Sequence, residues 1–136
     1  MNQYFKALLA EQTEMALATS VKDIPNVRIV NFYYDEETKK LFFISFKNSQ
    51  KIQELATNNR IALTIIPKGD GRYVRIQGRV KESQLSIEDI RSVFVQKYPY
   101  YQDIIEQHIN SLQLFEVSFS DAFLVLDNNQ VEKVKL

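Results

Sequence analysis

The chain has 136 residues, a length at which one globular domain removes roughly two thirds of its unfolded surface from water. Hydrophobic residues make up 45% and charged residues 25% of the sequence, which argues against a disordered or fibrous protein. Seventeen basic residues balance seventeen acidic residues, so no overall positive field would concentrate nucleic acid or an anionic membrane around the protein.

Other features of the whole chain bear on its location and its number of domains. The absence of cysteine excludes disulfides and thiolate metal sites, and it fits a reducing compartment. No run approaches the roughly twenty apolar residues that span a bilayer, and the N-terminus lacks a basic segment followed by a long apolar stretch. The sequence shows no internal repeat and no linker composition. We therefore expect a cytoplasmic protein with one domain over residues 1–136.

Strands and turns alternate in the first third of the chain. Apolar residues at helical spacing predict a helix within the first dozen positions, and a strand follows near Glu14–Ser20. Pro25 has no N–H to donate to a sheet, so it marks the entrance to a strand over Val27–Tyr34. An acidic turn leads to Leu41–Phe46 (LFFISF), which is apolar at nearly every position. This pattern predicts a central strand that is buried on both faces.

A helix and a hairpin are predicted in the middle of the chain. Ser49 is expected to cap a helix that ends at Asn58 and Asn59. A strand over Ile61–Ile66 and a turn at Gly69–Asp70–Gly71 lead into a second strand with a period of two. One face of that strand is apolar and comprises Val74, Ile76, Gly78 and Val80. The other face is polar and basic and comprises Tyr73, Arg75, Gln77, Arg79 and Lys81.

Helical and strand segments complete the chain. A capping box that begins at Ser86 opens a helix, which Pro99 interrupts before a second helical piece. Strands are predicted over Leu114–Ser120 and Ala122–Leu126, and a last turn at Asn128–Asn129. Six or seven short strands punctuated by helices predict a small antiparallel barrel or closed sheet with helices at its ends.

Familiar catalytic and metal-binding motifs are missing from the sequence. The only histidine, His108, lies in a predicted helix without a second histidine or cysteine, so we expect no metal site. The segment KGDGR lacks the Lys-Ser/Thr ending of a phosphate loop, and neither G-x-S-x-G nor G-x-G-x-x-G occurs. The sequence therefore identifies no catalytic residue.

Two segments, PNVRIVNF and LFFISFKNSQKIQEL, contain residue types that bind phosphate. Arg28 lies among apolar neighbours in a strand, and the expected start of a helix is surrounded by Ser45, Ser49 and Lys51. Free N–H groups at a helix start favour anions, and arginine, lysine and serine supply suitable charges and donors. On composition and spacing alone, the simpler interpretation is favoured, in which the two cations are exposed charges and Ser49 is only a cap.

The order and spacing of several segments resemble the FMN-binding split-barrel family, which includes pyridoxamine 5′-phosphate oxidase and the nitroimidazole-resistance proteins. The matching segments are PNVRIVN, FIS with the following S-x-K, IALTII and the strand YVRIQGRV. This resemblance covers most of the chain and implies a mainly β fold, namely a six-stranded antiparallel split β-barrel with helices. It also implies FMN as the cofactor, bound at the interface of a homodimer.

The resemblance further implies roles for individual residues. The flavin phosphate would be held by side chains around the helix start and the preceding strands, namely Arg28, Ser45, Ser49 and Lys51, and Gln50 is expected among the other cofactor-binding residues. Gln50 stands where the oxidases carry a second basic residue, which removes one candidate phosphate charge. The backbone that would face the isoalloxazine ring belongs to Ile29, Val30, Asn31 and Ile44. From the basic strand face, Tyr73 would touch the partner's flavin.

The chain departs from the named activities of this family. It ends at Leu136 without the C-terminal segment with which the oxidases hold pyridoxal phosphate. Nothing before Pro25 matches the characteristic histidine of the nitroimidazole-resistance proteins. We therefore expect neither of these two activities, and we hypothesise an FMN-dependent oxidoreductase that acts on another small molecule.

Two further functions stay open on the sequence alone. A non-catalytic flavin or haem carrier or sensor would account for the lack of an evident acid, base or substrate segment, and a deazaflavin is a third possible ligand. Nucleic-acid binding through the basic strand, with Tyr73 as a stacking platform, is disfavoured by the balanced net charge. We expect a small-molecule substrate and neither a nucleic-acid nor a membrane partner.

Overall fold

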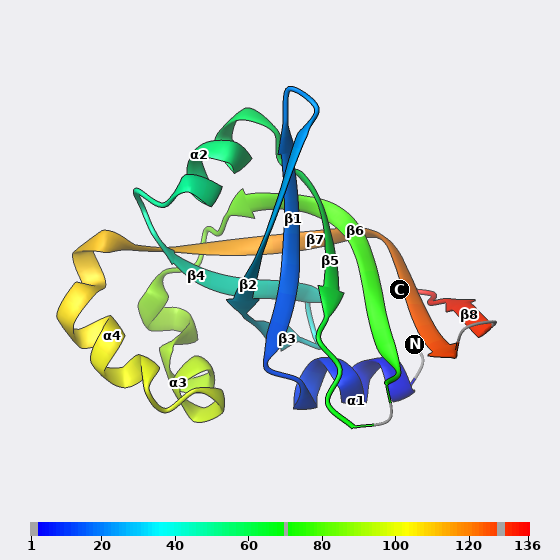
Figure 1. Cartoon of the computed structure of the whole chain (residues 1–136). Coiled ribbons are helices and arrows are strands. Elements are labelled where there is room, and N and C mark those ends of the chain that lie inside the picture. Colours follow the sequence, from blue (N-terminus) through cyan, green and yellow to red (C-terminus); the bar gives the residue numbers. More distant parts are fainter. Residues whose placement is uncertain (1–2, 70, 128–129) are drawn as a thin grey trace.

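The computed structural model in Figure 1 describes residues 3–69, 71–127 and 130–136. The strands are β1 (Glu14–Val21), β2 (Ile24–Asn31), β3 (Tyr33–Asp35), β4 (Lys40–Phe46), β5 (Arg60–Ile65), β6 (Tyr73–Glu82), β7 (Leu112–Asp127) and β8 (Gln130–Lys133). The helices are α1 (Gln3–Glu11), α2 (Gln50–Thr57), α3 (Ile87–Lys97), α4 (Tyr101–His108) and the short 3₁₀ helix η1 (Ile109–Ser111). Within these described ranges, no helix combines the length and apolar character needed to cross a bilayer.

One antiparallel sheet curls into an incompletely closed barrel. Its hydrogen-bonded order is β2-β1-β5-β6-β7-β4-β3, and β8 pairs with β7. β2 and β3 stand at opposite ends of this order, yet only Phe32 separates them in the chain. The sheet must therefore curl until its two edges approach each other, and the described pairings leave these edges unjoined. The prediction of a mainly β, antiparallel barrel with helices is confirmed.

The predicted number of six strands is wrong. In the described part of the chain, seven strands follow one another along the sheet and β8 adds an eighth beside β7. The segment predicted as a single strand, Val27–Tyr34, is divided between β2 and β3, whereas the two predicted strands Leu114–Ser120 and Ala122–Leu126 form the single strand β7. The strand without a predicted counterpart is β8, whose four residues are all exposed and therefore show no alternating pattern that would reveal a strand.

Tyr98 explains why the predicted strand divides at Phe32. Tyr98 is buried immediately after the end of α3. Its hydroxyl accepts a hydrogen bond from the Phe32 N–H (3.1 Å) and lies 2.6 Å from the Phe32 carbonyl oxygen. The same hydroxyl lies 2.8 Å from the Thr13 carbonyl oxygen. A side chain thus occupies the backbone groups that a continuous strand would use, and the Phe32 ring is fully buried.

Replacing Tyr98 with phenylalanine is expected to lower the free energy of unfolding by about 2 kcal/mol, because buried backbone groups of Phe32 would lose their partner. Urea denaturation of the variant and the wild type measures this difference. Tyr100→Phe is the matched control, since it removes an exposed hydroxyl, and its effect should stay below about 0.5 kcal/mol. Identical stability of Tyr98→Phe and the wild type would show that the hydroxyl does not hold Phe32.

Two hydrophobic clusters lie on opposite faces of β4. Leu41 and Phe43 belong to the barrel core, whereas Phe42 and Ile44 pack with residues of α3 and α4. The predicted burial on both faces is therefore confirmed, but the predicted central position is wrong, because β4 lies next to the edge strand β3. The outer face is buried by helices, and an apolar pattern alone does not distinguish this environment from a central strand.

Local patterns correctly predicted several other elements. On β6, alternate side chains are buried and exposed, as the period of two indicated. At the start of α3, Ser86 and Asp89 form both hydrogen bonds of the capping box. The turn predicted at Gly69–Asp70–Gly71 lies between β5 and β6, although Asp70 is outside the described residues. The turn predicted at Asn128–Asn129 also lies outside them.

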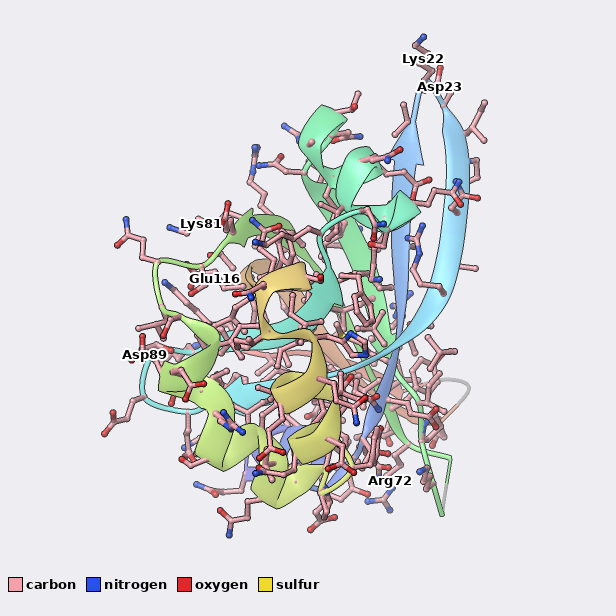
Figure 2. The ribbon with its side chains drawn as sticks, turned by 90° about the vertical axis from the view of Figure 1, so that its left-hand side faces the viewer. Lys22, Asp23, Arg72, Lys81, Asp89 and Glu116 are labelled. Carbon is pink, nitrogen blue, oxygen red and sulfur yellow. The ribbon has the colours of Figure 1, made fainter. Side chains whose placement is uncertain are left out.

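The hairpin of β1 and β2 projects beyond the body of the barrel. Figure 2 labels its tip, Lys22 and Asp23, whose φ angles are 52° and 65°. Two successive positive φ angles are typical of a type I′ turn, which matches the twist of paired strands. β1 pairs with β5 only over Met15–Ala18, so the outer part of the hairpin has no further strand neighbour among the described residues.

Candidate functional site

The residues expected around a phosphate meet where the split in the barrel adjoins the start of α2. β2 forms one edge of the split, and the end of β4 extends past its pairing with β3 at the other edge. The loop after β4 leads into α2, which packs on β1. This topology brings Arg28 of β2 near Lys51 of α2, so that the charge of one affects the other.

Arg28 is held by groups of its own chain. Its Nη1 atom donates hydrogen bonds to Thr19 Oγ1 (2.8 Å) and to the Leu17 carbonyl oxygen (3.3 Å). Its Nη2 atom forms an ion pair with the Glu54 carboxylate. Only 23% of the Arg28 side chain is exposed, so it is not a freely solvated surface charge.

Glu54 is a buried carboxylate on α2. Besides its contact with Arg28, it accepts hydrogen bonds from Thr19 Oγ1 and from Asn26 Nδ2. Burial acts to raise the pKa of the Glu54 carboxyl, but its three hydrogen bonds and the guanidinium charge outweigh burial and hold the pKa below its usual range. The carboxylate therefore stays ionised and fixed beside the guanidinium.

Lys51 lies three residues before Glu54 on α2 and is half-buried. Burial lowers the pKa of its ammonium, and the nearby charge of Arg28 lowers it further. Within the described part of the chain, no acceptor forms a hydrogen bond or ion pair with Lys51. A partly desolvated ammonium beside a second cation would be stabilised by an anion.

Two serine hydroxyls lie beside the start of α2. Ser49 occupies the predicted N-cap position, but its side chain makes no cap hydrogen bond. Its hydroxyl instead lies 3.0 Å from the hydroxyl of Ser45, at the end of β4. The Ile52 and Gln53 N–H groups donate to the Ser49 carbonyl oxygen, so at the start of α2 the N–H groups of Gln50 and Lys51 are the ones available to a ligand together with the hydroxyls.

Three residues expected to face a flavin ring through their backbone lie on the two edges of the split. Ile29 on β2 has an exposed side chain, whereas Val30 beside it is buried in the barrel core. The Ile44 side chain is buried under α3 and α4, and β4 is paired with β3 only as far as Phe42. The backbone of β4 beyond Phe42 therefore borders the split.

Asn31 is fixed at the end of β2 by three side-chain hydrogen bonds. Its amide donates to the Thr13 carbonyl oxygen (3.0 Å). Its Oδ1 atom accepts from the hydroxyls of Tyr100 (2.9 Å) and Tyr101 (3.3 Å), which lie at the start of α4. These contacts connect the edge of the split to the helices that cover the outer face of β4.

The remaining two predicted residues do not join this cluster within one chain. Gln50 is the exposed first residue of α2. Tyr73 begins β6 at the end of the barrel near α1, away from α2 (Figure 1). A contact between Tyr73 and a ligand at this site would therefore need a second copy of the chain. In the described residues, no three histidine, aspartate or glutamate side chains are arranged to hold a metal ion.

An open sheet face, rich in small and apolar residues, lies on the side of β2 that is opposite to Arg28. Its first row across β2, β1, β5, β6 and β7 consists of Ile29, Ala16, Thr64, Arg75 and Phe123. The adjacent row consists of Val27, Ala18, Ala62 and Gln77. Most of these residues line a groove of about 260 Å³. Val27 and Ile29 each expose more than half of their surface beside this groove.

Comparison with known sequences identifies the family. The sequence model described as pyridoxamine 5′-phosphate oxidase-like matches residues 8–130. The chain belongs to this family. It is 39% identical over 88 residues to the pyridoxine/pyridoxamine 5′-phosphate oxidase of Trichormus variabilis, and the match covers 64% of this chain and 41% of that oxidase. This oxidase-like chain thus spans about two fifths of the length of the curated relatives it matches.

Solved structures share the fold of this oxidase-like chain at low sequence identity. A NimC/NimA family protein from Clostridium acetobutylicum has a TM-score of 0.77 and 16% identity, with 98% of this chain and 91% of that chain covered. A FAD-binding protein from Mesorhizobium loti has a TM-score of 0.67 and 16% identity, with coverage of 88% and 87%. A heme binding protein from Mycobacterium smegmatis has a TM-score of 0.74 and 11% identity, with coverage of 96% and 56%. The split-barrel fold predicted from the sequence is confirmed.

Three residues of the candidate site were missed from the sequence, namely Thr19, Asn26 and Glu54. Asn26 lies two residues before Arg28, so the period of a strand places both on one face. Glu54 lies three residues after Lys51, so a helix also places these two on one face. These spacings were the available signals, whereas the contact between the two faces depends on how α2 packs on β1.

Proposed function

We propose that this chain binds FMN and that its 5′-phosphate is held by Lys51, Arg28 and the paired hydroxyls of Ser45 and Ser49. The observation that carries the proposal is the half-buried Lys51 ammonium, which lies beside Arg28 without an acceptor among the described residues. A phosphate would supply the missing negative charge, and the N–H groups at the start of α2 would donate to it. These residues fit a phosphate monoester. The ion pair of Arg28 with Glu54 fits it less well, because part of the cationic charge is already neutralised.

The proposal includes a homodimer with the cofactor at its interface. The open sheet face supports this assembly, because Val27 and Ile29 expose apolar surface beside a groove lined by small alanines. A two-fold axis would place this face against the same face of a second copy. Tyr73, which lies far from α2 within one chain, would then be able to reach the partner's ligand.

We further propose that the flavoprotein is a cytoplasmic oxidoreductase that acts on a small molecule. Bound FMN supplies hydride and electron transfer, whereas the protein supplies binding, orientation and electrostatics. In this chain the cations would bind the phosphate, and the paired backbones of β2 and β4 would position the ring at the split. The hydrogen-bonded Asn31 side chain would keep the end of β2 rigid.

A non-catalytic carrier or sensor of flavin or haem is the second candidate function. The heme binding protein of the same fold favours it, because that fold accommodates a cofactor other than a flavin. A haem propionate carboxylate would also offer Lys51 the anion that it lacks. A deazaflavin would fit the same argument. The ligand that the protein retains distinguishes these candidates.

The test is an absorbance spectrum of the purified protein after addition of excess flavin and removal of free ligand by desalting. FMN and riboflavin form the matched pair, since they differ only in the phosphate. We expect FMN to be retained and riboflavin to be lost, because only FMN engages Lys51. Retention of neither flavin would refute the proposal, and retention of haem in the same assay would favour the carrier. Sedimentation velocity tests the homodimer, and reduction of the bound flavin by NADH or NADPH tests the oxidoreductase.

A further inference from the structure

We infer that Glu54 competes with the flavin phosphate for Arg28 and thereby keeps the cofactor exchangeable. This inference rests on the proposed FMN site and adds a determinant of its affinity. This determinant is the Glu54 carboxylate, which is ion-paired with Arg28, the same cation that an anionic ligand would use. Such a site releases FMN more readily than a site in which both cations are unpaired.

The contacts of Arg28 show how much of its binding capacity the chain already uses. A guanidinium has five N–H donors. Both donors of Nη1 go to Thr19 and Leu17, and one donor of Nη2 goes to Glu54. The second Nη2 donor and the Nε donor form no hydrogen bond within the described chain. A phosphate that accepts from these two donors would lie close to the Glu54 carboxylate, whose negative charge repels the phosphate.

Glu54 is not free to withdraw when a ligand arrives. Donors from Thr19 and Asn26 hold its carboxylate in addition to Arg28, and the side chain is buried. The charges of Arg28, Lys51 and Glu54 sum to one positive charge, whereas a phosphate monoester carries about −1.5 to −2 near neutral pH. The site therefore does not neutralise its ligand by itself.

The same contacts would also suit an opposite role, in which Glu54 orients Arg28 for the phosphate. The place of the ion pair favours competition. Glu54 pairs with Nη2 of Arg28, the nitrogen that also carries one of the two donors left for an anion, so a phosphate on Arg28 approaches the Glu54 carboxylate. An orienting carboxylate would instead hold the guanidinium from a side remote from the ligand.

The test is Glu54→Gln, which keeps the shape and one acceptor oxygen of the side chain but removes its charge. Fluorescence titration gives the Kd of FMN and of riboflavin for the full-length wild type and variant. We expect FMN to bind about tenfold more tightly to the variant, a factor close to one charge-assisted hydrogen bond, and to dissociate more slowly. Riboflavin affinity should change by less than about twofold. Glu88→Gln on α3, which removes an exposed carboxylate, is the matched control and should leave both Kd values within about twofold.

The outcomes distinguish a failure of the Glu54 competition from a failure of the proposed FMN site. Unchanged or weaker FMN binding by Glu54→Gln, with the wild type still binding FMN, would overturn the competition and leave the FMN site standing. If neither protein binds FMN, both conclusions fail. If Glu54→Gln does not fold, Glu54→Asp keeps the charge but withdraws it from Arg28, and FMN should again bind more tightly than to the wild type. Weaker or unchanged binding by that variant would overturn the inference as well.

Discussion

Substitution of Gly78 by alanine is expected to lower the free energy of unfolding by about 3 kcal/mol. Gly78 lies on the inward face of β6, at the bulge where the register with β7 shifts. A Cβ atom at this position would overlap the carbonyl oxygen of Ser118 and lie 3.1 Å from its carbonyl carbon. Both are backbone atoms, so no side-chain rotation relieves the overlap and the two strands must move apart.

Urea denaturation of Gly78→Ala measures this cost, and Gln77→Ala provides the matched control. Gln77 is the neighbouring residue on the exposed face of β6, so its truncation should change stability by less than about 0.5 kcal/mol. β6 and β7 share a long antiparallel pairing, from Tyr73 to Glu82, so we expect the loss to affect the whole fold in a single transition. Equal midpoints for the two variants would contradict the close approach at Gly78.

The β6 strand also shows which parts of the fold are readable from sequence. The alternation from Tyr73 to Lys81 depends only on which face each residue presents, so a period of two predicted the buried and exposed faces correctly. A glycine at an inward position signals a close backbone approach. The partner in that approach, Ser118, is set by the register with β7, which no local pattern contains.

Elements whose surroundings come from distant segments were predicted less well. LFFISF is buried on both faces because α3 and α4 cover its outer side, not because β4 is central. The division of the strand at Phe32 depends on the hydroxyl of Tyr98, which arrives from the end of α3. In both cases the local sequence is compatible with two environments, and tertiary packing decides between them.

The residues of the candidate site also differ in whether the local sequence predicts them. The residues quoted for the family resemblance are brought together in pairs, Arg28 with Lys51 and Ser45 with Ser49. Glu54 has the pattern of an ordinary polar residue on an amphipathic helix, and its burial arises only when α2 packs on β1. The sequence therefore pointed to the cations of the site but not to the anion that already occupies one of them.

Arg28 is ion-paired with Glu54, whereas Lys51 has no acceptor among the described residues, so the two cations are not equally suitable for a binding test. Arg28→Ala would remove a candidate phosphate contact, but it would also leave the buried Glu54 carboxylate without its cation and lower the stability of the fold. Weaker FMN binding by that variant would have two causes. Lys51 has no acceptor among the described residues, so its replacement leaves no buried partner unpaired.

Lys51→Met is therefore expected to raise the Kd of FMN about 30-fold, equivalent to about 2 kcal/mol, while the Kd of riboflavin stays unchanged. Stability should not fall, because burial and the Arg28 charge disfavour the ammonium in the folded protein, whereas methionine keeps the apolar stem. Fluorescence titration and thermal unfolding measure the two effects. Lys47→Met, in the exposed loop before α2, controls for net charge and should change the FMN Kd by less than about twofold. Equal losses in both variants would indicate a general charge effect, and unchanged affinity in Lys51→Met would remove this ammonium from the phosphate site.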